Sequence, residues 1–168
     1  PSAGPLAHLM DIWKTAAPSI DILAPDIYFA DFRERIALYD RGGNPLFLPE
    51  VRYESFSGPE SYEPACGPKA FYAFGNHDAL GFSPFFIEST SEAVKEPITK
   101  SYEILEQLSP LILEHQGNKS MKGFLFDKQH QSDTIQLGGY TIIAKHDYSL
   151  GWSPNSKDEI WPITGGLI

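Results

Sequence analysis

The 168-residue sequence has little of what marks several large classes of protein. It has one cysteine, Cys66, so no intramolecular disulfide can form. Only 13 residues are Lys or Arg against 22 Asp or Glu, which gives a net charge of −9. Because binding to nucleic acid or to an anionic membrane surface needs a basic face, this charge argues against both partners. No apolar run approaches the roughly 18 residues that a membrane-spanning helix needs.

Signals for cofactors are also scarce. There is no glycine-rich loop of the kind that cradles phosphate groups. The five histidines, at positions 8, 77, 115, 130 and 146, are scattered and lack the spacing of a helical metal site. We therefore expect no metal or organic cofactor. Cys66 has no base near it in the sequence and is interpreted as a thiol that does not act as a nucleophile. A lone thiol is compatible with the cytoplasm and with an exported enzyme, so the compartment stays open.

Apolar residues are plentiful enough for a sizeable core. The sequence is 42% hydrophobic and 13% aromatic, which excludes general disorder. The length favours about one domain. The chain starts abruptly at Pro1, without a visible signal peptide, and stops at Gly165–Ile168, where an apolar strand has just begun. These two ends lead us to expect a segment of a longer protein.

Short apolar strands alternate with amphipathic helices along the first two thirds of the chain. The patterns predict strands at 20–29, 45–49 and 79–85, and helices at 5–17, 31–39, 68–76, 91–108 and 109–117, the last capped by Ser109. Each of these strands reads as buried on both faces. Strands at 134–137 and 140–144 follow, joined by Gly138-Gly139, a two-residue hairpin signal.

This alternation predicts an α/β fold with a parallel sheet. Three strands are too few to close a barrel but fit the last three units of a (β/α)8 barrel. We therefore assign residues 1–117 to the C-terminal portion of such a barrel. Residues 118–168 are assigned to the start of a β-rich, sandwich-like accessory domain.

Chemistry in parallel α/β folds lies at the carboxyl ends of the strands. Glu50, which follows Leu-Phe-Leu-Pro, is the strongest candidate because its carboxylate emerges from an apolar strand onto that end. Such a group suits a glycosidase nucleophile, which must be rigid and ionised. Arg52 lies two residues further on and is expected to help keep Glu50 ionised. The alternative is a glutamate that caps a helix or pairs with Arg52.

Neighbouring strand ends add further candidates for a carbohydrate site. Tyr28 ends the preceding strand and is expected to donate a hydrogen bond to Glu50. Asp26 lies at the same strand end, and Phe85 ends the next strand. In the loop 51–67, aromatic side chains suit stacking on sugar rings, with loop packing as the alternative for each; they are Tyr53, Phe56 and Tyr62.

Three motifs together resemble a known family. They are Pro-Asp-Ile-Tyr-Phe at 25–29, Gly-Asn-Pro-Leu-Phe-Leu-Pro-Glu at 43–50, and the run from Ala70 to Gly75 with His77 to Phe85. They resemble bacterial β-galactosidases of glycoside hydrolase family 35, in the branch with a β-rich domain of unassigned function behind the barrel. Residues 146–152 are similar to the start of that domain.

The resemblance implies a retaining barrel glycosidase whose nucleophile is Glu50, with Tyr28 touching it. It implies that Asp26, Arg52, Tyr53 and Phe85 bind substrate. Where related enzymes carry a tryptophan under the sugar, this chain offers Phe82 and Phe85. The acid/base glutamate should lie outside this chain, so the 168 residues alone are expected to be inactive.

The implied substrates carry terminal β-D-galactosyl residues, in an oligosaccharide or a plant polysaccharide, or a close analogue such as α-L-arabinopyranosyl. The alternatives are another retaining glycosidase of the same clan, such as a β-glucosidase or β-mannosidase, and a non-catalytic glycan-binding fragment. The resemblance favours a periplasmic or extracellular location, with a cytoplasmic one as the alternative. The sequence leaves the oligomeric state open.

Overall fold

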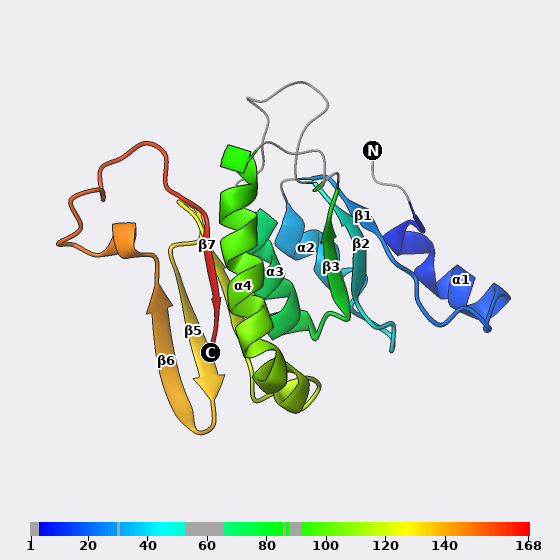
Figure 1. Cartoon of the computed structure of the whole chain (residues 1–168). Helices are drawn as coiled ribbons and strands as arrows, with labels where there is room; N and C mark the ends of the chain where they lie inside the picture. Colours follow the sequence, from blue (N-terminus) through cyan, green and yellow to red (C-terminus); the bar gives the residue numbers. More distant parts are fainter. Residues whose placement is uncertain (1–3, 30, 53–65, 86, 88–91) are drawn as a thin grey trace.

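The computed structural model describes residues 4–29, 31–52, 66–85, 87 and 92–168, with the backbone alone for 92–96. The fold is mixed α/β (Figure 1). Its elements are η1 (Ala7–Leu9), α1 (Met10–Ala16), β1 (Asp26–Ile27), α2 (Phe32–Ala37), β2 (Phe47–Val51), α3 (Cys66–His77), β3 (Gly81–Pro84), α4 (Glu92–His115), β4 (Gly123–Phe126), β5 (Ser132–Leu137), β6 (Tyr140–Lys145), η4 (Asp147–Ser149) and β7 (Thr164–Leu167). Among the described residues, no helix is long and apolar enough to cross a membrane.

The first three strands form one parallel sheet in the order β1-β2-β3. The prediction of parallel neighbours is therefore confirmed. All three strands end at the same edge, because parallel strands run in one direction. In the register, Asp26 lies opposite Glu50 and Leu48 lies opposite Phe82.

The first strand is much shorter than the sequence predicts. Only Asp26–Ile27 pair as a strand, and Ile22 and Phe29 are each 38% exposed, so the prediction that residues 20–29 are buried on both faces is wrong. The reason lies in Asn44, which is buried. Its side-chain oxygen accepts the N–H of Leu23 at 2.9 Å and its amide donates to the Leu23 carbonyl at 3.1 Å. The Asn44 side chain thus makes the two hydrogen bonds that a neighbouring strand would otherwise make to Leu23. Pro25 has no N–H and cannot donate a hydrogen bond to a neighbouring strand.

An irregularity in β2 decides which way its side chains face. Leu48 lies opposite Phe82 and Val51 opposite Pro84, so three steps along β2 match two steps along β3. This mismatch is a β-bulge, which places Leu48 and Val51 on the same face and re-aims the residues between them. Leu48 and Val51 are fully buried, whereas Glu50 is partly exposed.

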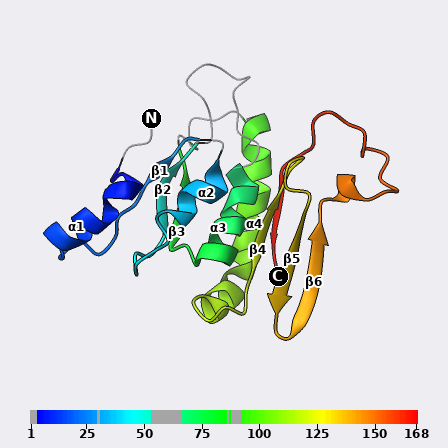
Figure 2. The same cartoon turned by 180° about the vertical axis from the view of Figure 1, so that it is seen from behind.

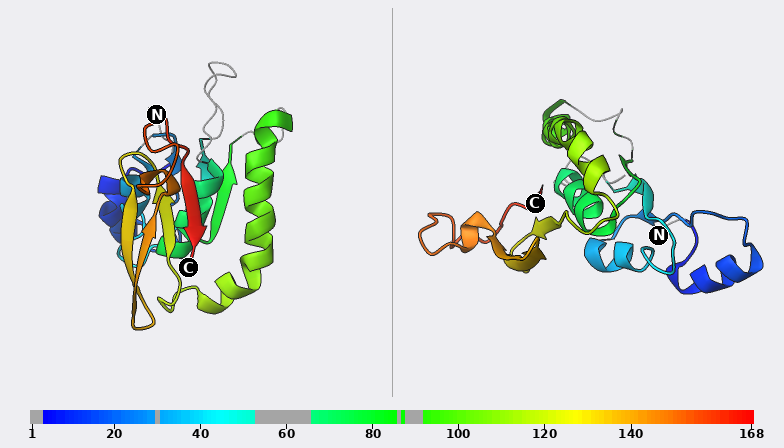
Figure 3. Two further views of the ribbon diagram at one scale, coloured as in Figure 1. Left: turned by 90° about the vertical axis from the view of Figure 1, so that its left-hand side faces the viewer. Right: turned by 90° about the horizontal axis from the view of Figure 1, so that it is seen from below.

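Helices cover one face of the sheet. In Figures 1 and 3, α3 and α4 lie between the parallel sheet and the C-terminal strands. The buried residues of the sheet's covered face are Ile27, Leu48, Val51 and Phe82, which belong to the same core as Phe32 and Ile36 of α2 and Ala70 and Ala73 of α3. The hydroxyl of Tyr102 on α4 donates to the carbonyl of Phe82 at 2.7 Å. The core therefore sits between sheet and helices. The described residues of the other face, among them Phe47, Glu50 and Ser83, are partly or fully exposed, so the prediction that the strands at 45–49 and 79–85 are buried on both faces is wrong as well.

Helix α4 is continuous from Glu92 to His115, so the prediction of separate helices at 91–108 and 109–117 is wrong. Ser109 does not act as a cap, because its hydroxyl donates back to the Leu105 carbonyl at 2.9 Å. Leu105 and Ile112 are buried on either side of Pro110, and this packing holds the helix together across the proline. Gly117 has a φ of +78°, so the expected glycine stop just after the helix is confirmed.

The C-terminal strands form two antiparallel pairs, β4 with β7 and β5 with β6. The predicted hairpin is confirmed: Gly138 and Gly139, with φ of +55° and +82°, join β5 to β6. Strands β4 and β7 lie against α3 (Figure 2). Glycines make this approach possible, because a Cβ on Gly75 would lie 2.5 Å from the Gly123 Cα and a Cβ on Gly123 would lie 2.6 Å from the Phe71 carbonyl oxygen.

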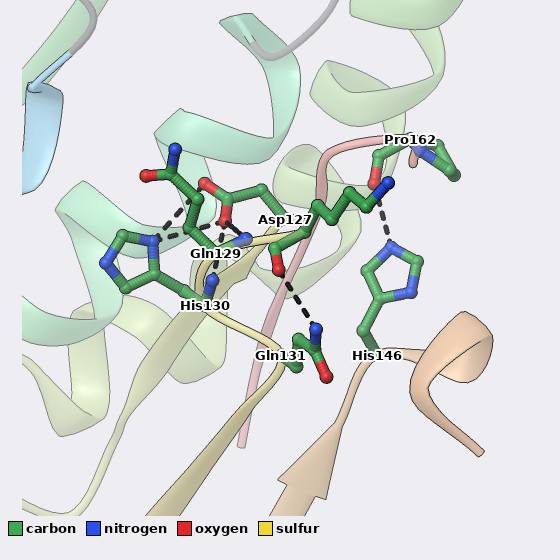
Figure 4. Close-up of polar contacts among 7 residues, drawn as sticks. Asp127, Gln129, His130, Gln131, His146 and Pro162 are labelled. Atoms are coloured by element: carbon green, nitrogen blue, oxygen red, sulfur yellow. Dashed lines mark hydrogen bonds and ion pairs between the residues drawn. The ribbon is translucent and has the colours of Figure 1, made fainter. Parts of the chain in front are cut away.

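Two polar side chains tie the ends of the hairpin to the rest of the chain (Figure 4). Asp127 accepts the backbone N–H groups of Gln129 and His130, both at 2.7 Å, and so shapes the turn after β4. Burial alone would raise the pKa of Asp127, but the hydrogen bonds from His130 and Gln129 outweigh this effect, so the pKa is lower than usual.

His146 is buried, and its Nε2 donates to the Pro162 carbonyl at 2.8 Å. This histidine is therefore a satisfied core residue.

Candidate functional site

Four of the predicted site residues meet at the carboxyl end of the parallel sheet. Asp26 belongs to β1, Tyr28 follows it, Glu50 lies in β2, and Phe85 follows β3. The Tyr28 hydroxyl donates a hydrogen bond to the Glu50 carboxylate, as the sequence predicts. The rings of Tyr28 and Phe85 make an edge-on contact with centroids 6.0 Å apart. The structure thus gathers a carboxylate, its hydrogen-bond donor and an aromatic ring around one point.

The backbone around Glu50 is held on both sides. The N–H of Arg52 donates to the Ile27 carbonyl at 2.9 Å, and the N–H of Phe85 donates to the Val51 carbonyl at 2.9 Å. These bonds continue the sheet beyond the bulge. Glu50 is inside the strand Phe47–Val51, so the prediction that it directly follows a strand ending at Pro49 is corrected. A carboxylate on a clamped strand is positioned more rigidly than one on a loop.

The site concentrates negative charge. Burial, and then the charge of Glu50, raise the pKa of Asp26 above its usual value. Burial, the hydrogen bond to Glu50 and the charges of Glu50 and Asp26 raise the pKa of the Tyr28 hydroxyl. Tyr28 therefore remains a hydrogen-bond donor throughout the neutral range. The Glu50 carboxyl group thus lies next to a phenol that keeps its proton and beside a second carboxyl, that of Asp26, which gives up its proton reluctantly.

We expect Asp26→Asn to raise the melting temperature at pH 7. The raised pKa of Asp26 means that its favourable contribution is complete below the unfolded-state pKa, near 3.9, and is lost as the pH rises through the folded-state value. At pH 7 the ionised carboxylate therefore destabilises the fold, and the neutral amide removes that cost. The increase in melting temperature should shrink as the pH falls from 7 towards 4. Thermal unfolding of both proteins, followed by circular dichroism at several pH values, will measure it.

The control for this experiment is Asp21→Asn, which changes the net charge equally on an exposed residue. It should leave the melting temperature unchanged at every pH. A melting temperature of Asp26→Asn at or below that of the parent at pH 7 would contradict the electrostatic account.

Other predicted site residues are not brought to Glu50. Arg52 forms no ion pair with Glu50 within the part of the chain that the structure describes, so its expected role in keeping Glu50 ionised has no contact behind it. Tyr53 lies outside the described residues, as do Phe56 and Tyr62. Phe82 is 6% exposed and packs against Phe32 of α2, so it belongs to the core and offers no surface to a sugar. Of the two phenylalanines, Phe85 is the one at the site, where its ring contacts Tyr28.

Sequence reasoning missed a second polar cluster. His77, at the end of α3, pairs with Asp40 through Nδ1 at 2.7 Å, whereas its sequence neighbour Asp78 accepts the backbone N–H of Gly117. Residues 40 and 77 are far apart in the chain, so no local signal announces their pairing. Within the described ranges, no group of three or more His, Cys, Asp or Glu side chains is arranged to hold a metal ion.

Comparison with known proteins finds a matching family model for the C-terminal part of the chain. A model described as "Domain of unknown function (DUF5597)" matches residues 98–168. The matched part begins inside α4 and includes β4 to β7, so it leaves out Tyr28, Glu50 and Phe85. No curated protein matches the sequence significantly. The C-terminal part of the chain is thus similar to a domain family whose description assigns no activity.

Proposed function

We propose that this chain carries the nucleophile of a retaining glycoside hydrolase that removes terminal β-D-galactosyl residues from oligosaccharides or plant polysaccharides. The observation that carries the proposal is the hydrogen bond from Tyr28 to Glu50 at the carboxyl end of a parallel sheet. An ionised carboxylate held by a phenol, at the edge where parallel α/β folds place their chemistry, suits nucleophilic attack on a sugar. The motif resemblance supplies the galactoside specificity.

We further propose that residues 1–117 are the last three units of a (β/α)8 barrel and that residues 118–168 begin a β-rich domain. Two features support this architecture. Helices cover one face of the sheet, and the other face, which carries Asp26, Tyr28 and Glu50, is open in the described part of the chain. In a complete barrel the open face would line the interior, and Glu50 would lie at its mouth.

In the proposed mechanism the Glu50 carboxylate attacks the anomeric carbon, and the bond to the leaving oxygen breaks. A second carboxyl group protonates that oxygen, then takes a proton from the water that cleaves the covalent galactosyl–enzyme. The resemblance assigns the second carboxyl to a segment outside these residues, about 5–5.5 Å from Glu50 as retention requires. Tyr28 holds the Glu50 carboxylate in position through its hydrogen bond, and Phe85 braces Tyr28.

The proposal is tested by covalent trapping in the polypeptide that contains these residues. A 2-deoxy-2-fluoro-β-galactoside with a good leaving group slows both steps and accumulates the glycosyl–enzyme. We expect proteolysis and mass spectrometry to find the label on Glu50 alone. The corresponding fluoro-glucoside and fluoro-mannoside should label more slowly. Labelling of Glu54 or Glu60 instead, or no label with any of the three sugars, would reject Glu50 as the nucleophile.

A further inference from the structure

A cavity of about 360 Å³ lies where helices α2 and α3 meet the C-terminal part of the chain. Its wall combines residues of four segments, which are α2, α3, the end of β4 with the turn after it, and the chain just before β7. Its volume is in the range of pockets that hold small molecules. Glu50 lies on the other face of the parallel sheet, so the helix layer separates this cavity from the proposed catalytic centre (Figure 1).

Part of the cavity wall is the indole ring of Trp161. Its Nε1 donates to the Asp158 carbonyl at 3.1 Å, and the His146 ring packs against it with centroids 5.0 Å apart. Tyr148 makes a further edge-on contact, with centroids 5.8 Å apart. These contacts hold the indole in place, yet Trp161 is only partly buried and lines the cavity. A fixed and accessible indole suits stacking against the apolar face of a ring-shaped ligand.

Helix α2 contributes two charged side chains to the wall, Arg33 and Glu34. Neither side chain forms a hydrogen bond or an ion pair with other described residues. The Arg33 guanidinium lies 5.0 Å from the ring centroid of Tyr72, a contact that uses a face of the guanidinium and leaves its N–H groups without acceptors. No nitrogen of Arg33 is both buried and unpaired, so its N–H groups keep surface that a ligand can reach. A guanidinium stays protonated in proteins and can only donate.

The turn after β4 contributes the amide of Gln129. Its backbone N–H is fixed by Asp127, whereas its side chain is exposed and makes no hydrogen bond to the described residues. In Figure 4 this side chain extends away from His146. An amide both donates and accepts, and pH does not change this. The cavity therefore offers donors from Arg33, acceptors from Glu34 and both kinds of group from Gln129.

These groups narrow the chemistry of a ligand. Side chains of both charges line the cavity, which disfavours a simple cation and a simple anion alike. An apolar ligand would cover Arg33, Glu34 and Gln129 without giving them partners, which costs free energy. A hydroxyl group both donates and accepts, so it can pair with all three. A sugar carries several hydroxyl groups and also an apolar ring face that matches Trp161.

We propose that this cavity binds a sugar residue, which stacks on Trp161 and forms hydrogen bonds with Arg33, Glu34 and Gln129. The site is separate from the proposed catalytic centre at Glu50. It does not depend on the proposed function, which enters only in the choice of a galactoside as probe.

The test is a titration of the complete polypeptide, labelled with 5-fluorotryptophan, with methyl β-D-galactopyranoside and ¹⁹F NMR as the readout. We expect a saturable shift of the Trp161 signal, which Trp161→Phe identifies by removing it. The Trp152 signal, identified in the same way, is the internal control and should not change, because this side chain is 81% exposed but does not line the cavity. Sorbitol, which has hydroxyl groups but no sugar ring, and sodium sulfate, an anion probe, should give no saturable shift.

Two variants test the polar contacts, again with the Trp161 signal as readout. Gln129→Ala removes an exposed amide and should weaken binding about fivefold. Arg33→Met keeps a long side chain but removes the N–H groups, and should weaken binding about tenfold or more. Gln107→Ala, on an exposed residue of α4, is the matched control and should bind as the parent does. Weaker binding in either test variant supports the site.

Three results reject the proposal. They are no saturable Trp161 shift up to the solubility limit of the sugar, unchanged binding in both Gln129→Ala and Arg33→Met, and equal shifts with sorbitol or sulfate. Repeating the titration after the fluoro-galactoside has labelled Glu50 separates the two sites, because the Trp161 shift should persist. A shift that is lost in the labelled protein would assign the binding to the catalytic centre and reject this site. A Trp161 shift in a protein whose Glu50 fails to take the label would support this site and reject the proposed function.

Discussion

Replacing Glu50 with glutamine should lower kcat for a nitrophenyl β-galactoside by about 10⁴-fold or more, which corresponds to about 5.4 kcal/mol of lost transition-state stabilisation. The amide has nearly the same size as the carboxylate but cannot form the glycosyl ester. The Tyr28 hydroxyl can still donate to the amide oxygen, so folding should be unaffected. Steady-state kinetics on the complete polypeptide, with melting temperatures for both proteins, will measure the two effects.

Replacing Glu50 with a smaller side chain distinguishes a nucleophile from an acid/base residue. Glu50→Ala leaves space beside the anomeric carbon, where added azide can attack from the side that Glu50 occupied. We expect azide to restore turnover and to give the α-galactosyl azide, with inverted configuration, because one displacement replaces two. A β-configured azide product would instead assign the acid/base role to Glu50. Glu114→Gln, at the C-terminal end of α4, is the control and should keep parental kinetics.

Gly75→Ala should destabilise the fold by about 3 kcal/mol, at the upper end of the usual cost of overpacking. On an exposed helical surface the same change stabilises by roughly 1 kcal/mol, because alanine favours the helix. Here the new Cβ would lie 2.5 Å from the Gly123 Cα and would also overlap the Gly123 nitrogen and the Leu167 side chain. Backbone atoms of a paired strand have little room to move, so α3 and β4 must separate. Urea unfolding will measure the difference.

The matched control for this substitution is Gly151→Ala. Nothing lies within 4 Å of a Cβ at Gly151, and its φ is not in the left-handed region. This variant should stay within about 0.5 kcal/mol of the parent. If Gly75→Ala were as stable as the parent or more stable, the close approach of α3 to β4 would not contribute to the fold.

Much of the candidate site was accessible from local sequence patterns. Strands that alternate with helices must run parallel, since right-handed crossovers return the chain to the same edge of the sheet. That rule places Tyr28, Glu50 and Phe85 together, and the structure has them there. The rule does not extend to Arg52. This residue is close to Glu50 in the chain, but closeness in the chain does not decide whether two side chains form an ion pair.

Other features required the tertiary structure. The β-bulge that turns Glu50 away from the buried face depends on how β2 pairs with β3, and nothing in residues 47–51 encodes it alone. The continuity of α4 through Pro110 depends on a core that buries Leu105 and Ile112. A proline signals a break locally, but packing along the whole helix decides the outcome.

The sequence by itself determined the parallel pairing of the three strands and the edge where Glu50 lies, because a strand–helix–strand connection brings the chain back in the same direction. It also determined the hairpin at Gly138-Gly139, because a two-residue glycine turn is a local signal. Only the tertiary structure decided that α3 lies between the parallel sheet and β4, and that Asp40 pairs with His77. These contacts join residues far apart in the chain. They form only when the packed core brings their elements together, so no local pattern carries them.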